Sequence, residues 1–229
     1  MPTSKTLKPA FDFLKRLKKN NNREWFNDHK DQYLLAHQNV IDFADDLLAK
    51  MAKHDLIETQ SGKKSLFRIY RDTRFSKDKT PYKSNWAGGF KRATKKLRGG
   101  YYFHIQPGNS MIAGGFWNPN SQDIKHIREQ IAQDDVPLRK VLRSKKFKDY
   151  FGELQGEQVK TAPKGFDKDH SSIDLLRYKQ LILVHNFKDS EVLQKDFSAK
   201  VAQGFKNMRP FMDCMSEILT TDLNGVSLA

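Results

Sequence analysis

The chain has 229 residues, 38% of them hydrophobic, and a net charge of +14. A chain of this length can bury about 70% of the surface that its unfolded form exposes, so a proper core is available. Its one cysteine, Cys214, excludes an intramolecular disulfide and a zinc site built from cysteines, which predicts a reducing compartment.

No part of the sequence indicates export or a membrane. The first 22 residues lack an apolar run long enough for a signal peptide, and no run of about 18 apolar residues occurs anywhere. We therefore expect a cytoplasmic protein without membrane association.

The N-terminal part, residues 9–53, is predicted to be helical. Apolar residues recur every three positions over 9–19, and the asparagine run at 20–22 ends that helix. A second, long helix is expected from Arg23 to about Lys53, because its apolar residues broadly follow a 3.6-residue period. The aromatic residues of both helices are interpreted as core.

The period changes to two within residues 64–118, which predicts a sheet. Residues 66–71 are expected to form a half-buried strand with Phe67 and Ile69 on one face, although a helix competes. Trp86–Lys91 is a second strand candidate that Gly88 and Gly89 weaken. The clearest hairpin joins strands at 101–105 and 111–117 through Pro107, Gly108 and Asn109.

Residues 121–178 are expected to be helices and loops, and residues 180–219 a strand and a closing helix. The expected elements are a helix from an N-capping Ser121 to about Gln133, helices over 136–143 and 145–151, a loop over 152–170, helical turns over 171–178, a buried strand over 181–184 and a helix over 190–219. The sequence thus predicts an α+β fold with an antiparallel sheet of about four to six strands, flanked by N- and C-terminal helices in a single domain, 1–229.

The positive charge is concentrated in one stretch. Residues 63–98 hold 13 basic and 2 acidic side chains, an excess of 11 within the total of +14. Such a density of like charge costs free energy by self-repulsion, so it indicates an anionic partner. The alternative is a solvated basic loop that only aids solubility.

Residues 67–83 are the most informative segment, with six cations, two carboxylates and four aromatic residues in 17 positions. Arginine holds phosphate or carboxylate oxygens in pairs, and lysine adds a compact charge. Cations on such a segment could surround one anion if the chain folds back at Pro81. The expected ligand-binding residues are Arg68, Arg71, Asp72, Arg74, Lys77, Lys79, Tyr82 and Lys83.

Two residues are candidate proton carriers. Asp78 could act as a base or as a metal ligand, whereas Asp72 is expected to fix the rotamer of Arg71 or Arg74 and to have a lowered pKa. His104, on the expected hairpin, could face the basic segment as an acid, a base or a phosphate donor. Two carboxylates without a nearby histidine are a weak metal signature, so no metal and no cofactor is expected.

The basic segment also resembles a known family. Arg68-x-x-Arg71-Asp72-x-Arg74-Phe75, followed by Asp78-Lys79-x-x-Tyr82, is similar to the signature of the domain-of-unknown-function family 2461, a group of bacterial hypothetical proteins of about this length. Supporting pieces are Asn21-Asn22-Arg23, Trp25-Phe26, Tyr101-Tyr102-Phe103-His104, Gly114-Gly115, Trp117-Asn118-Pro119 and Pro163-Lys164-Gly165-Phe166. The resemblance implies no reaction, cofactor or catalytic residue.

Four hypotheses follow from the segment. The first is a binding site for a phosphorylated ligand. The third is an enzyme that acts on a phosphoester, with Asp78 or His104 as the proton carrier. The fourth is an internal network of Arg68, Arg71 and Asp72 without a ligand. The second is a nucleic-acid-binding surface. Its positive charge is extended by Lys91, Arg92, Lys95, Lys96 and Arg98. The aromatic rings that could stack on bases are Tyr70, Phe75, Tyr82, Trp86 and Phe90. Oligomeric state is not predicted.

Overall fold

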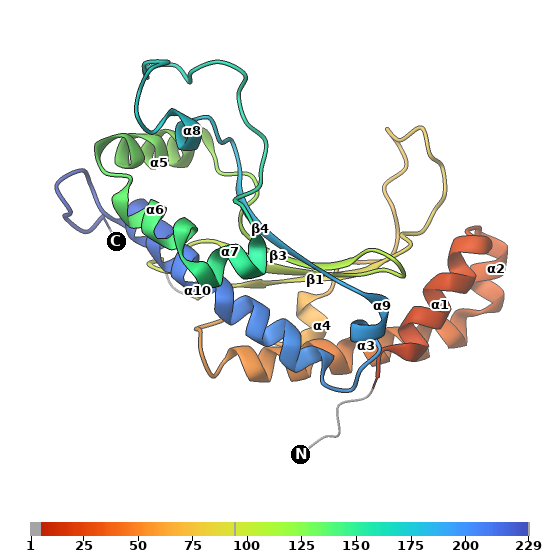
Figure 1. Ribbon diagram of the computed structural model, residues 1–229. Coiled ribbons are helices and arrows are strands. Elements are labelled where there is room, and N and C mark those ends of the chain that lie inside the picture. The colour runs from red at the N-terminus through yellow and green to blue at the C-terminus, as the bar shows by residue number, and fades with distance from the viewer. Residues whose placement is uncertain (1–5, 94, 229) are drawn as a thin grey trace. The chain divides into compact units, whose positions relative to one another are not determined.

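The computed structural model describes residues 6–93 and 95–228 and shows an α+β fold (Figure 1). Four strands form one antiparallel sheet, with helices before it in the chain and a long helix near the C-terminus, so the predicted fold class is confirmed. Among the described residues, no helix is both long and apolar enough to cross a membrane.

The chain divides into two compact units, each made of discontinuous segments. The first consists of Met1–Phe90, Tyr102–Ile112 and Asn186–Gly204. The second consists of Lys91–Tyr101, Ala113–His185 and Phe205–Ala229. The single domain expected from the sequence stays a prediction, because compactness does not show whether the units fold independently.

The N-terminal helices differ from the prediction in one place. Helix α1 (Lys8–Lys19) buries its expected apolar stripe, but the long second helix is two helices, α2 (Arg23–Asp28) and α3 (Lys30–Met51). His29 separates them with non-helical dihedrals, and its ring Nδ1 lies 2.8 Å from the carbonyl oxygen of Trp25. This side-chain contact at the end of α2 has no signature in the apolar period, so the sequence predicted one continuous helix.

Residues 66–71 form isolated bridges and not the regular strand that was predicted. Phe67 N donates to Ala87 O at 2.9 Å, and Lys83 N donates to Ile69 O at 2.8 Å. These isolated pairs follow α4 (Gly62–Ser65) and join residues 66–71 to residues 81–88 in an antiparallel direction. The expected shared face is also wrong, because Ile69 is buried whereas Phe67 is 51% exposed.

The sheet has the order β1-β2-β3-β4. Its strands are β1 (Trp86–Lys91), β2 (Gly100–Ile105), β3 (Ser110–Phe116) and β4 (Leu181–Phe187). The predicted hairpin of β2 and β3 is confirmed, and Gly108 in its turn has a φ of 78°, which glycine adopts at little cost. Along β2, Tyr101, Phe103 and Ile105 are buried, so Tyr102 and His104 lie on the opposite face.

The remaining helices largely follow the prediction. They are α5 (Ser121–Gln133), α6 (Val136–Arg143), α7 (Lys145–Phe151), α8 (Ile173–Leu176), α9 (Asp189–Val192) and α10 (Phe197–Thr220). The N-cap of α5 is Asn120 and not Ser121, because the Asn120 side chain accepts from the backbone N–H groups of Gln122 and Asp123. The predicted closing helix is likewise two helices, α9 and α10.

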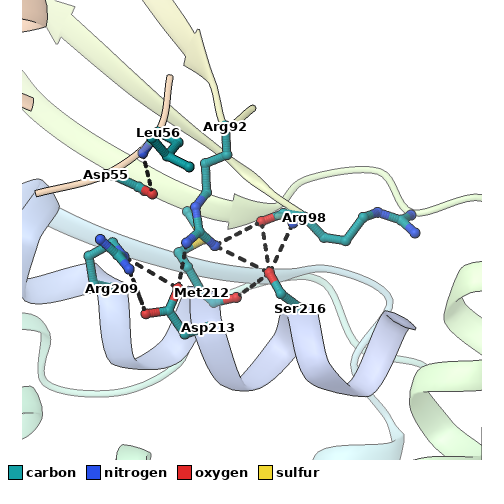
Figure 2. Close-up of polar contacts among 8 residues, drawn as sticks. All are labelled: Asp55, Leu56, Arg92, Arg98, Arg209, Met212, Asp213 and Ser216. Atoms are coloured by element: carbon teal, nitrogen blue, oxygen red, sulfur yellow. Dashed lines mark hydrogen bonds and ion pairs between the residues drawn. The ribbon is translucent and has the colours of Figure 1, made fainter. Parts of the chain in front are cut away.

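Arg92 belongs to a buried polar network in the second unit (Figure 2). Its side chain is 0% exposed, forms an ion pair with Asp213 and donates to Ser216 Oγ at 3.2 Å. The backbone N–H of Arg98 donates to the same hydroxyl oxygen at 2.9 Å, and the Arg98 side chain pairs with Asp123. Two arginines of the basic stretch therefore have acidic partners inside their own unit.

Candidate functional site

The basic segment forms a loop whose two ends are held together. Arg71 N donates to Pro81 O at 2.9 Å, and Tyr70 and Tyr82 form an antiparallel bridge. Figure 1 shows the intervening residues as a long loop that projects from the sheet. The chain therefore reverses within residues 72–80, and Pro81 lies at the base of the loop and not at the fold-back, where the sequence placed it.

The guanidinium of Arg71 is fixed at one end. Its Nη1 donates to both Asp78 Oδ2 and Thr80 Oγ1, and its side chain is 26% exposed. Its Nη2 lies 3.5 Å from Ser76 Oγ, at the limit of a hydrogen bond. Among residues 6–93 and 95–228, Nε of Arg71 has no hydrogen-bond partner. The protein therefore orients the guanidinium through Nη1, and the Nε–H group can donate a hydrogen bond to a ligand.

Asp78 is more constrained than its sequence neighbours suggested. Its Oδ1 accepts from Thr80 N at 2.9 Å and from Thr80 Oγ1 at 2.8 Å, and its Oδ2 accepts from Arg71. The backbone hydrogen bond from Thr80, followed by the side-chain bonds, lowers the pKa of Asp78 to about 2. A carboxylate with so low a pKa is a weak general base at neutral pH.

Asp72 pairs with Arg74, which is one of the two partners expected for it. Arg74 Nε and Nη2 donate to its two oxygens at 3.0 and 2.7 Å. These side-chain hydrogen bonds lower the pKa of Asp72, as expected. Arg74 is nevertheless 77% exposed, so the pair lies in solvent and contributes little to stability.

A cleft of about 320 Å³, the Arg71 cleft, lies beside the loop. It is lined by Lys18, Asn21, Arg71, Asp78, Thr80, Tyr82, Lys83, Ser84 and Asn85. Three cations and one carboxylate give the lining a net charge of +2. Hydroxyl and amide side chains supply further hydrogen-bonding groups, which is the composition that binds an anion.

Two cations of the Arg71 cleft are unpaired. Among the described residues 6–93 and 95–228, neither Lys18 nor Lys83 has an acidic partner. Burial, followed by the like charge of Arg68, lowers the pKa of Lys83. An anion in the cleft would offset this penalty by pairing with the ammonium group.

Tyr82 forms a fixed wall of the Arg71 cleft. Its ring stacks on Phe26 at 4.0 Å between centroids, and it is buried. Tyr82 and Arg71 also line a smaller cleft of about 290 Å³ with Arg23, Asn27, Tyr70, Thr73 and Pro81. Arg71 is thus common to both clefts.

A third cleft of about 440 Å³, the His104 cleft, adjoins the first. It is lined by Phe67, Arg71, Asp72, Lys83, Asn85, Ala87, Tyr102 and His104. His104 therefore faces part of the basic segment, as the sequence suggested. Its Nδ1 lies 3.1 Å from Tyr102 Oη and its Nε2 lies 2.8 Å from Gln106 Oε1. Because Gln106 Oε1 can only accept, Nε2 of His104 donates to it.

The structure brings together only part of the expected ligand set. Arg71, Tyr82 and Lys83 line the Arg71 cleft, and Asp72 lines the His104 cleft. Lys79 instead donates to Thr73 O at 3.0 Å. The other expected residues, all exposed and outside the linings of these three clefts, are Arg68, Arg74 and Lys77.

Five residues of the Arg71 cleft were missed by sequence reasoning. They are Lys18, Asn21, Thr80, Ser84 and Asn85. The asparagine run at 20–22 was interpreted as a helix end, although an unusual amide cluster beside a basic helix was a usable signal. Lys18 carried no such signal, because a lysine near a helix C-terminus is common.

The wider nucleic-acid surface loses several of its expected members. Tyr82, Trp86 and Phe90 are buried and cannot stack on bases, and Arg92 is buried against Asp213. Phe75, which is 95% exposed, and Tyr70 remain accessible. Among the described residues, no group of three or more metal-ligating side chains is close enough to hold an ion.

Comparison with known proteins identifies one family. Residues 9–214 match the family described as conserved hypothetical protein (DUF2461). The match includes every residue of the Arg71 and His104 clefts. No curated protein and no solved structure matches the chain. The family description states no ligand and no reaction.

Proposed function

The chain belongs to the DUF2461 family, and we propose that it binds a small phosphate-bearing ligand in the Arg71 cleft. The observation that carries this proposal is the gathering of Arg71, Lys18 and Lys83 around one cleft. The two lysines have no acidic partner in the part of the chain that the structure describes. A surface that existed only for solubility has no reason to enclose unpaired cations in a concavity.

The roles of the cleft residues follow from their contacts. Asp78 and Thr80 orient the guanidinium of Arg71, so little rotamer freedom is lost when an anion binds. Lys18 and Lys83 supply point charges, and Ser84 can donate a hydroxyl hydrogen bond to a phosphate oxygen. The cleft volume of about 320 Å³ suits a small ligand.

The competing hypotheses have less support. An internal network of Arg68, Arg71 and Asp72 does not fit the observed pairs, which are Arg71 with Asp78 and Arg74 with Asp72. Turnover of a phosphoester lacks a placed base, because Asp78 has a pKa of about 2 and His104 lines a different cleft. We therefore propose binding and not catalysis.

Binding can be tested by calorimetric titration with inorganic phosphate and with simple phosphate monoesters. Arg71→Gln and Lys83→Gln should each weaken binding at least about tenfold, because each removes a charge-assisted hydrogen bond. Arg74→Gln is the matched control: it removes an arginine of the same loop that does not line the cleft.

The outcomes separate the possibilities. Equal losses in Arg74→Gln and Arg71→Gln would place binding on the exposed loop and contradict the cleft. Absence of binding by every phosphate compound, with the unfolding transition intact, would overturn the proposal. A steep salt dependence with an oligonucleotide only would favour the nucleic-acid alternative.

A further inference from the structure

We propose that the phosphate-bearing ligand also carries a planar aromatic ring, as a nucleoside monophosphate does, and that this ring lies in the His104 cleft. This inference rests on the proposed function and assigns a chemical class to its ligand. It depends on the continuity of the two clefts and on the different chemistry of their linings.

The two clefts share three residues. Arg71, Lys83 and Asn85 line both, so the cations that would hold a phosphate stand at the border of the His104 cleft. All lining residues belong to the first compact unit. A ligand whose phosphate contacts Arg71 and Lys83 therefore has adjoining space for its remaining group.

The His104 cleft is built from flat and apolar surfaces. Ala87 of β1 and Tyr102 of β2 come from neighbouring strands of the sheet. Phe67 stacks on Tyr102 with ring centroids 6.2 Å apart and an interplanar angle of 26°. Phe67 is half exposed, so one apolar ring remains available to solvent beside the cations. A planar ring is the ligand group that gains most from such a surface.

Asn85 supplies the side-chain amide that would hydrogen-bond to polar atoms of the ligand's ring in this cleft. Tyr102 and Gln106 contact both ring nitrogens of His104, so the imidazole ring is held in one orientation. Among residues 6–93 and 95–228, the Asn85 side chain has no hydrogen-bond partner. Its amide offers a donor and an acceptor, which matches the polar edge of a heterocyclic ring.

The test compares a ligand that carries both phosphate and ring with ligands that lack one of the two. The full chain is titrated calorimetrically with adenosine monophosphate, ribose 5-phosphate, adenosine and inorganic phosphate. We expect adenosine monophosphate to bind about 5- to 150-fold more tightly than ribose 5-phosphate, the range for stacking one base on an aromatic side chain. Phe67→Ala should remove most of this difference and leave the affinity for ribose 5-phosphate unchanged.

Phe75→Ala is the matched control. Phe75 is an exposed ring of the same loop that does not line the His104 cleft, so its removal should change neither affinity. Phe67→Leu, which keeps apolar volume without a ring, should behave like Phe67→Ala if stacking is the cause.

Failure of this inference is distinguishable from failure of the proposed function. Equal affinities for adenosine monophosphate and ribose 5-phosphate, both lost in Arg71→Gln, would overturn the ring subsite and retain the phosphate site. Binding of adenosine as tightly as its monophosphate would overturn both. Tighter binding of a single-stranded oligonucleotide, with a steep salt dependence and a loss in Phe75→Ala, would overturn the small-molecule ligand in favour of nucleic acid.

Discussion

Asn21 forms two hydrogen bonds with the backbone of Tyr82, one from each end of its side-chain amide. Its Nδ2 donates to Tyr82 O at 2.9 Å, and its Oδ1 accepts from Tyr82 N at 3.1 Å. The amide thus pairs with a backbone unit 61 positions away as a neighbouring strand would. This contact joins the end of α1 to the Arg71 cleft, which Lys18 of α1 also lines.

Asn21→Ala should lower the free energy of unfolding by about 1–3 kcal/mol, because two hydrogen bonds to backbone are lost. It should also weaken phosphate binding, since the wall formed by Tyr82 loses its anchor. Chemical denaturation and calorimetry measure the two effects. Asn20→Ala is the control and should leave phosphate affinity unchanged, because the Asn20 side chain donates to Arg16 O within α1 and not to the cleft.

Asp78 should titrate far below an ordinary aspartate. The folded pKa of about 2 lies below the unfolded value of about 3.9, so its contribution to stability is present above about pH 3.9 and is lost as the pH falls through 2. NMR titration of the carboxyl carbon checks this pKa. In Arg71→Gln the Asp78 pKa should rise, and a wild-type value near 3.9 would contradict the hydrogen bonding.

Phosphate affinity should follow the ligand's own ionisation near neutral pH. Because Asp78 stays ionised above pH 4, the affinity for a phosphate monoester should rise between pH 5 and 7.5, as the second phosphate proton with a pKa of about 6 is lost. Calorimetry with a sulfate monoester, which carries no such proton, supplies the comparison and should show no rise. A rise with sulfate would assign the titration to the protein.

Gly115→Ala should destabilise the second unit by at least about 2 kcal/mol. Gly115 has a φ of 125°, and a Cβ at this position would overlap the carbonyl oxygen of Leu181. Thermal unfolding measures the loss. Gly108→Ala is the contrast: its φ of 78° also favours glycine, but an added Cβ meets no atom within 4 Å among the described residues, so the cost should be smaller.

Cys214 should react slowly in the folded protein. Burial, followed by the negative charge of Glu217, raises the pKa of its thiol to about 11. At pH 8 very little thiolate is present, so a disulfide reagent should modify native Cys214 many times more slowly than the unfolded chain. Equal rates in the two states would contradict the raised pKa of this thiol.

Local order was predictable from the sequence. The apolar period of α1, the hairpin of β2 and β3, and the helices α6 and α7 depend on residues close together in the chain, and the pattern indicated all of them. Arg71 and Asp78 could likewise be singled out, because the family signature that contains them is a pattern of residues close together in the chain. The errors at His29 and at residues 66–71 arose where a side-chain contact or a distant partner decided the backbone conformation.

The composition of the site depended on tertiary structure. The charge density of residues 63–98 could be counted from the sequence alone, and it predicts an anionic partner, because charge is a property of the sequence. Which cations meet was decided by packing: Lys18 joins Arg71 and Lys83, while Arg74 remains in solvent. The physical reason is that α1 is placed beside residues 82–85 by contacts such as the hydrogen bonds between Asn21 and Tyr82. These bonds join residues 61 positions apart, so no local sequence pattern indicates them.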